Sequence, residues 1–256
     1  MRVCKTVKLL IASATCAMSA SGLGAQTANA DTLVWQSRTQ SFRDAKCAAR
    51  ACTAAELTWP DFSGRIGPQA RVNELLFITL APSENARAEL QRRRSIAAVG
   101  REFLNAARSG SDPGLPWDAR RTISVVCNTP TRVLLRSDES SFTGGAHGNS
   151  FSLFAAFAPA TGAKVPPEAM VPPAARAAIL PMVERAFRRE RELAPTASLP
   201  EQGYTFKDDH FELSTAFLAV CGSSLFVHWN AYSIASYAAG PTHLVIPLDS
   251  VPMLRQ

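Results

Sequence analysis

The sequence has 256 residues, enough for one large domain or two small ones, with 46% hydrophobic and 19% charged residues. Its formal net charge is +6, and half of this excess comes from Arg2, Lys5 and Lys8, which lie in a segment that we expect to be removed. The charge that remains does not indicate a nucleic-acid partner. Arginine-rich stretches at 92–94 and 188–191 are typical of solvated helix faces, with a patch for anionic glycan or lipid as the alternative.

The amino-terminal residues have the pattern of a secretory signal. The positive residues precede an apolar stretch from Leu9 to Ala20, and Ala28-Asn29-Ala30 has the small-x-small pattern that signal peptidase accepts. We therefore expect residues 1–30 to be a cleaved signal peptide and the mature chain to be periplasmic or secreted. The apolar stretch is shorter than the roughly 20 residues that cross a bilayer, and no later stretch is long enough, so we expect no integral membrane segment in the mature chain.

Four cysteines remain after Cys4 and Cys16 leave with the signal: Cys47, Cys52, Cys127 and Cys221. An even number of cysteines in an oxidising compartment favours disulfides over a metal site or a reactive thiol. Three pairings are possible. Because Cys47 and Cys52 can close a local loop, we favour Cys47–Cys52 and Cys127–Cys221, and the second bridge would join two distant apolar segments.

The first half of the mature chain predicts a strand followed by helices. Ala55, Leu57 and Trp59 alternate with polar residues, which is the period of a strand. Apolar residues then recur at helical spacing over about 72–80 and again over 85–109. Two helices are therefore expected after the first strand.

The second half is richer in strands. Thr122–Val126 and Arg132–Leu135 predict an antiparallel pair, and residues 151–157 predict a third strand. A helix is expected to start at Pro172-Pro173, and three further short strands are expected within 211–220, 225–229 and 244–247. This order predicts an α+β fold, a mainly antiparallel sheet with helices grouped on one side.

The most unusual local string is Phe142-Thr143-Gly144-Gly145-Ala146-His147-Gly148-Asn149, between two of the expected strands. Its glycines allow positive φ and a close approach of the backbone to a partner. The spacing fits neither a phosphate loop nor a dinucleotide fingerprint. Two interpretations stay open: a hairpin connection in which His147 bonds to the backbone, or a ligand-facing loop in which Gly144, Gly145 and His147 contact a partner.

A second string, from Trp229 to Gly240, carries two tyrosines separated by small residues. Tyr232 and Tyr237 could form an aromatic surface that stacks on a sugar or fills a cleft. Packing in the core is the alternative.

Signatures of catalysis and of metal binding are absent from the sequence. It has no nucleophile elbow, no HExxH helix and no paired-carboxylate motif, so we expect no catalytic residue and no cofactor. The four histidines, at 147, 210, 228 and 243, lie on separate segments, and none has a second ligand at metal spacing, so we expect no metal site.

Three strings together resemble the extracytoplasmic domain of the RsiV and PdaC type. They are Leu57-Thr58-Trp59-Pro60-Asp61-Phe62-Ser63-Gly64, the glycine-rich string, and Tyr232-Ser233-Ile234-Ala235-Ser236-Tyr237-Ala238-Ala239-Gly240 followed by Val245-Ile246-Pro247. That domain occurs in lysozyme-sensing anti-sigma factors of the RsiV type and in the amino-terminal part of peptidoglycan deacetylases of the PdaC type. The resemblance covers about 53–254 and implies a single domain over 31–256, with parts at about 53–110 and 120–254. Ser236 departs from the pattern, which has a proline there.

What the resemblance implies is a non-catalytic cell-envelope module that recognises a lysozyme-like protein or peptidoglycan. We expect neither control of a sigma factor nor deacetylase chemistry. The expected ligand-binding residues are Gly144, Gly145, His147, Tyr232 and Tyr237. An envelope hydrolase that uses His147 and a purely structural envelope protein stay as alternatives. A carboxylate within hydrogen-bond reach of His147 would favour the enzyme, whereas exposed aromatic rings without one would favour binding.

Overall fold

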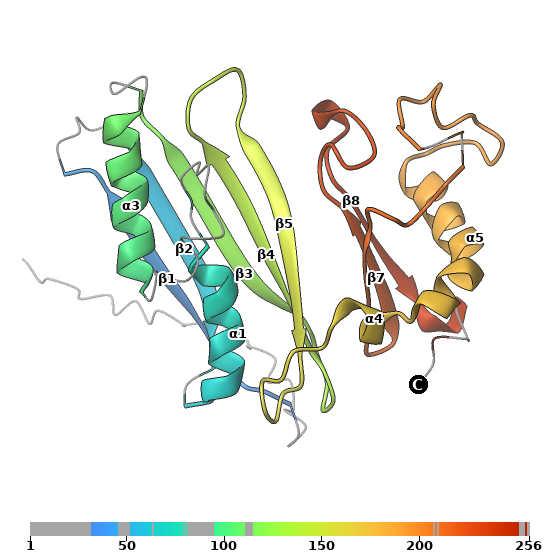
Figure 1. Cartoon of the computed structure of the whole chain (residues 1–256), viewed down its shortest axis with the longest axis horizontal. Helices are drawn as coiled ribbons and strands as arrows, with labels where there is room; N and C mark the ends of the chain where they lie inside the picture. The colour runs from blue at the N-terminus through green and yellow to red at the C-terminus, as the bar shows by residue number, and fades with distance from the viewer. Residues whose placement is uncertain are drawn as a thin grey trace, which may run out of the picture.

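The computed structural model describes residues 32–45, 52–62, 64–78, 80, 95–110, 115–206, 208, 210–250 and 254. Its strands form two sheets (Figure 1). The larger sheet has the order β1-β2-β3-β4-β5: Gln36–Arg43, Ala54–Asp61, Asp118–Asn128, Val133–Phe142 and Asn149–Phe157. The smaller has the order β6-β7-β8: Phe217–Cys221, Ser224–Trp229 and Thr242–Pro247. Only the β2–β3 pair is parallel, so the prediction of an α+β fold with mainly antiparallel strands is confirmed.

Two helices, α1 (Ile66–Leu76) and α3 (Ile96–Ser109), belong to the connection between β2 and β3. A parallel pair needs such a crossover, because the chain must return to the same end of the sheet. The helical spacing seen in the sequence buries Val72 and Leu76 of α1 and Val99 and Phe103 of α3 against one face of the five-stranded sheet. Ser95 caps the start of α3 by accepting a hydrogen bond from the backbone N–H of Ala98 (3.2 Å).

A buried ion pair ties α1 to the sheet. Arg121 of β3 is 1% exposed and pairs with Glu139 of β4. The same guanidinium donates to the carbonyl oxygens of Leu76 (3.1 Å) and Ile78, at the carboxyl end of α1. Those carbonyls have no partner inside the helix, so Arg121 satisfies them while the carboxylate neutralises its charge.

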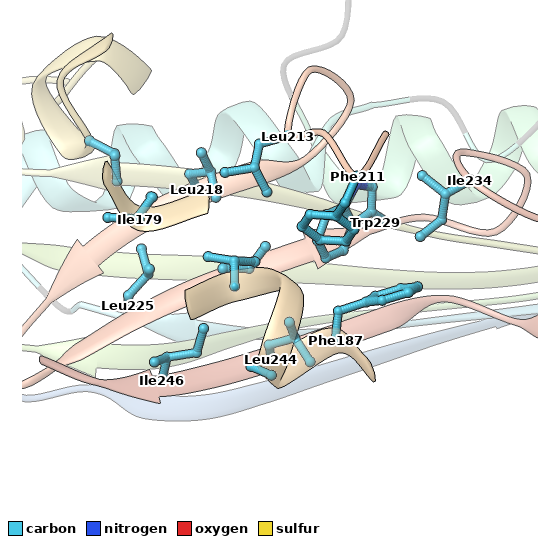
Figure 2. Packing of buried hydrophobic residues seen from close by; sticks show 14 of the residues in the cluster. Ile179, Phe187, Phe211, Leu213, Leu218, Leu225, Trp229, Ile234, Leu244 and Ile246 are labelled. Atoms are coloured by element: carbon cyan, nitrogen blue, oxygen red, sulfur yellow. The ribbon is translucent and has the colours of Figure 1, made fainter. Parts of the chain in front are cut away.

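The smaller sheet packs against α5 (Pro173–Glu190), which follows the short α4 (Pro167–Met170). Prolines at the start of α5 suit its first turn, where the missing N–H would have no helical partner. Figure 2 shows the core between helix and sheet, in which Phe187 lies near both Phe211 (5.2 Å between ring centroids) and Trp229 (5.8 Å). Residues that alternate along each strand supply the rest of this core, for example Leu225 and Val227 of β7.

The two sheets pack face to face. In β4, Val133 and Leu135 point toward α1 and α3, whereas Leu134 points to the other side. There it meets residues of the smaller sheet, among them Ala219 and Phe226. The chain therefore has four layers, helix, sheet, sheet and helix, with apolar contacts between each neighbouring pair (Figure 1). Helices α1 and α3 cover the outer face of the larger sheet and α5 covers the outer face of the smaller one, whereas Met170 of the short α4 packs between the sheets.

A disulfide between Cys127 of β3 and Cys221 of β6 joins the two sheets, as the sequence predicted. Cys52 is also disulfide-bonded. Cys47, its expected partner, lies outside the described residues, as does the expected signal peptide at 1–30. None of the helices in the described part of the chain is long and apolar enough to cross a membrane. The single domain over 31–256 stays a prediction.

Candidate functional site

The structure brings His147, Tyr232 and Tyr237 together at one surface position, which we call the ring cluster. The imidazole of His147 stacks on the ring of Tyr237, with 4.5 Å between centroids and 19° between planes. The ring of Tyr232 lies 5.4 Å from that of Tyr237. Its hydroxyl is 3.5 Å from Nε2 of His147, although the two residues are 85 positions apart in the chain. Two strings that looked unusual in the sequence therefore form one feature.

The β4–β5 hairpin loop carries His147 to this position. Gly144 and Gly145 adopt φ of +99° and +92°, a left-handed conformation that side chains other than glycine rarely tolerate. An added Cβ at Gly145 would meet no atom within 4 Å, so backbone conformation rather than space explains the glycine there. Gly144 and Gly145 shape the loop and are not themselves members of the ring cluster.

The segment between β7 and β8 holds both tyrosines in a fixed frame. Ile234, between them, is buried in the core between α5 and the smaller sheet, and its carbonyl accepts from the N–H of Thr205 (2.8 Å). Arg191, just after α5, donates to the carbonyl oxygens of Ala239 and Pro241 (both 2.9 Å). The rings are therefore held before any ligand arrives, which lowers the ordering cost of binding.

Tyr232 stands out within this segment. Its side chain is 63% exposed, and its backbone has φ +67°, which is uncommon for a residue with a side chain. Such a conformation costs on the order of 1 to 3 kcal/mol, and residues that keep one are enriched at binding and catalytic sites. Tyr232 therefore displays a large ring to solvent in a strained conformation.

The hydrogen bonds of His147 define what its imidazole can do. Nδ1 lies 2.7 Å from the carbonyl oxygen of Gly148, so Nδ1 carries the hydrogen and donates. In the neutral ring, Nε2 is then an acceptor that faces the Tyr232 hydroxyl. Among the described residues no carboxylate lies within hydrogen-bond reach of this imidazole, and this arrangement lacks the acid that would orient a general base.

A cavity of about 240 Å³ lies between the five-stranded sheet and the segment that carries the tyrosines. We call it the corner cavity, because strands β3 to β5 form its floor and Asn230 and Pro241 form its wall. On the floor, Asp138 accepts from Nε of Arg136 (2.7 Å) and from the hydroxyl of Ser152 (2.6 Å). These polar side chains occupy the same face of the sheet that packs against the smaller sheet through Leu134.

Asn230 joins the wall of the corner cavity to its floor. Its side-chain oxygen accepts from the backbone N–H of Ser152 (2.6 Å), and its amide nitrogen donates to the carbonyl of Ser152 (3.0 Å). An amide side chain thus pairs with the free edge of β5 as another strand would. The same oxygen of Asn230 lies 3.2 Å from Nε2 of His228, which must therefore donate.

His228 is 1% exposed and packs 5.2 Å from Phe154, between the two sheets. Its Nδ1 is buried and has no hydrogen-bond partner among the residues that the structure describes, so a second proton would have no acceptor from them. Burial, reinforced by the nearby charge of Arg136, lowers the pKa of His228 to about 4. Burial also lowers the pKa of His243, which faces His228 across the β7–β8 pair.

Sequence reasoning did not find the corner cavity. Arg136, Asp138 and Ser140 alternate along β4, and this period does place them on one face. The same pattern is ordinary for a solvated strand, however, and nothing local shows that Asn230 will stand beside it. Across the described residues, no group of three or more His, Cys, Asp or Glu side chains is arranged to hold a metal ion.

Comparisons with known proteins address the fold rather than the ligand. Residues 169–249 match a family described as a protein of unknown function, DUF3298. A DUF3298 family protein from Pseudomonas aeruginosa PAO1 is similar in structure, with TM-score 0.63, 19% identity, and coverage of 86% of this chain and 93% of that one. A DUF3298 member from Bacteroides fragilis has TM-score 0.55 and 13% identity, and the match covers 85% of this chain and 92% of that one. No curated protein matches the sequence. Residues 169–249 are therefore similar to the DUF3298 family, and the chain has the fold of solved proteins described as DUF3298 members.

Proposed function

We propose that the chain is a non-catalytic recognition domain of the cell envelope that binds peptidoglycan or a lysozyme-like protein through the ring cluster. The observation that carries this proposal is the stack of His147 on Tyr237 beside the exposed Tyr232. Aromatic rings that are exposed yet held rigidly are suited to stacking on sugar rings and to anchoring a protein interface.

Binding is favoured over hydrolysis by the surroundings of His147. Its Nδ1 is engaged by a backbone carbonyl, and its Nε2 faces a tyrosine hydroxyl. A hydrolase that used this imidazole as a base would need a carboxylate or a nucleophile beside it. Among the described residues, the ring cluster has no carboxylate beside this imidazole. It presents the flat apolar faces of its aromatic rings and Nε2 of His147 as a hydrogen-bond acceptor.

Export is part of the proposal. The small-x-small site at Ala28-Asn29-Ala30 follows an apolar stretch. The Cys127–Cys221 disulfide is of the kind that persists in oxidising compartments. Amino-terminal sequencing of the exported protein should therefore begin at Asp31, and a retained Met1 or a lipid on Cys16 would contradict it.

The test compares mature wild-type protein with His147→Ala and Tyr237→Ala in binding to purified peptidoglycan and to lysozymes. Loss of an aromatic anchor typically costs at least about 2 kcal/mol, so affinity should fall roughly thirtyfold. His210→Ala is the matched control, because His210 is exposed and lies outside the ring cluster. Its affinity should stay at the wild-type level.

Melting temperatures separate a contact from a packing role. A variant that loses binding at an unchanged melting temperature supports the proposal. Wild-type protein that binds neither peptidoglycan nor any lysozyme would refute it. Cleavage of a peptidoglycan fragment by wild type, abolished in His147→Ala, would replace it with the hydrolase alternative.

A further inference from the structure

The face of the five-stranded sheet that α1 and α3 leave uncovered is rich in hydroxyl groups. Pairing registers align one row across all five strands: Thr39, Thr58, Thr122, Asp138 and Ser152. The hydroxyls of Thr39 and Thr58 lie 3.0 Å apart and are exposed. We call these five residues the hydroxyl row. The row runs from the free edge at β1 into the corner cavity, so the row and the cavity form one continuous polar surface.

Several polar groups of the corner cavity have spare hydrogen-bonding capacity. Asp138 uses only Oδ1 for Arg136 and Ser152. Arg136 uses only its Nε. Among the described residues, Oδ2 of Asp138, the two Nη atoms of Arg136 and the hydroxyl of Thr122 make no hydrogen bond. The cavity therefore offers a ligand one acceptor, the Asp138 oxygen, and donors on Arg136. The Thr122 hydroxyl can donate or accept.

Charges on this surface are balanced in pairs. Arg136 is neutralised by Asp138 at 2.7 Å, and Arg120, which also lines the cavity, lies 3.4 Å from Glu56. An anionic ligand would be attracted by the two arginines and repelled by the Asp138 and Glu56 carboxylates. A cationic ligand would be attracted by the carboxylates and repelled by the arginines. The surface therefore has no net attraction for either sign and fits a neutral ligand.

The two segments that carry the ring cluster also border the corner cavity. Ser140 and Ser150 line the cavity and flank the loop that carries His147. Asn230 and Pro241 form its wall and bound the segment that carries the two tyrosines. The residues that line the cavity on both sides are therefore close in sequence to the three residues of the ring cluster.

We propose that the corner cavity is a subsite for one sugar ring of a neutral glycan, whose chain continues along the hydroxyl row toward β1. The inference rests on the proposed function and narrows its ligand to a glycan. Each sugar hydroxyl both donates and accepts, so adjacent hydroxyls match the unpaired Asp138 oxygen and Arg136 nitrogens. The ring cluster supplies flat surfaces for the apolar face of a neighbouring sugar.

The test measures affinity for a soluble hexamer of β-1,4-linked N-acetylglucosamine, for an anionic hexamer of galacturonate, and for purified peptidoglycan. Thr122→Val keeps the shape and the strand propensity of the residue and removes only its hydroxyl. Asp138→Asn removes the cavity's carboxylate charge. Thr215→Val is the matched control, because Thr215 is exposed and lies outside the cavity.

The neutral hexamer should bind better than the anionic one. Affinity should fall about fivefold in Thr122→Val and about tenfold in Asp138→Asn, the usual range for a lost neutral and a lost charge-assisted hydrogen bond. It should be unchanged in Thr215→Val. Binding of peptidoglycan that responds to the same variants assigns the glycan strand of peptidoglycan as the source, whereas binding of the hexamer alone assigns another neutral glycan.

Three outcomes would overturn the inference. If Tyr237→Ala weakens binding of peptidoglycan or lysozyme while Thr122→Val and Asp138→Asn do not, the cavity is no subsite, although the proposed function stands. Tighter binding of the anionic hexamer would refute a neutral ligand. Absence of binding to every probe, lysozymes included, would remove the proposed function and this inference together.

Discussion

On acidification, His228 binds a proton at a higher pH in the unfolded chain than in the folded chain. The folded pKa is lowered from 6.5 to about 4, because the imidazole is buried with Nδ1 unpartnered and Arg136 nearby. As the pH falls below 6.5, the unfolded chain binds a proton at this residue and the folded chain does not. Stability must therefore fall over this window and level off below the folded pKa.

The magnitude follows from the two pKa values. Between about pH 7 and about pH 4, the difference in proton binding by this one residue amounts to at most about 3 kcal/mol of unfolding free energy. His228→Gln removes the titration while keeping a donor for Asn230. Urea unfolding of wild type and variant at several pH values isolates the contribution of this residue, because the other titrating groups are common to both chains.

The variant should lose less stability on acidification than wild type, by up to about 3 kcal/mol. His243→Gln gives a second curve, because the pKa of His243 is also lowered by burial. If the curves of wild type and His228→Gln run parallel from neutral to acid pH, the imidazole is not held neutral between the sheets. The account of its unpartnered Nδ1 would then be wrong.

Three further predictions concern stability, each measured by chemical denaturation. Replacement of Cys127 and Cys221 by alanine should cost about 4.7 kcal/mol, because the bridge closes a loop of 94 residues; an unchanged midpoint would contradict a bridge between the sheets. Gly67→Ala should destabilise by about 2 kcal/mol despite better helix propensity, since the added Cβ would lie 2.0 Å from the carbonyl oxygen of Thr161; a stabilised variant would show that this contact is not tight. Tyr232→Gly should be more stable than Tyr232→Ala by about 1 kcal/mol, because glycine tolerates φ +67°; the opposite order would argue against the strained backbone.

Local patterns predicted the elements whose side chains alternate or repeat between core and solvent. Ala55 and Leu57 are buried in β2, as their alternation indicated. Val72 of α1 and Val99 and Phe103 of α3 are buried, as the helical spacing indicated. Strand β1 left no such signal. Its sequence, Gln36 to Arg43, is polar, because it is an edge strand exposed on nearly all of its positions. A strand is recognised in a sequence by the alternation of buried apolar and exposed polar residues, which requires one buried face, and β1 largely lacks one.

For the candidate site, local sequence patterns identified individual residues but not their arrangement in space. His147, Tyr232 and Tyr237 each lie in a string that is unusual by itself, so sequence could name them. Their stacking depends on how two sheets pack, which no local pattern encodes. Asp138 and Asn230 were not predicted, because neither Asp138 in β4 nor Asn230 just after β7 is unusual in its local sequence, and their shared cavity exists only in the folded chain.

The smaller sheet has two apolar faces, and this limits the settings in which it can occur. One face is covered by α5, whereas Phe217, Ala219 and Phe226 of the other face lie against β4 and β5. The DUF3298 match at 169–249 includes α5 and the smaller sheet and leaves out the strands that cover this second face. In this chain the matched segment by itself would leave that apolar face uncovered. A fragment cut at residue 169 should therefore associate with itself or aggregate rather than remain a stable monomer.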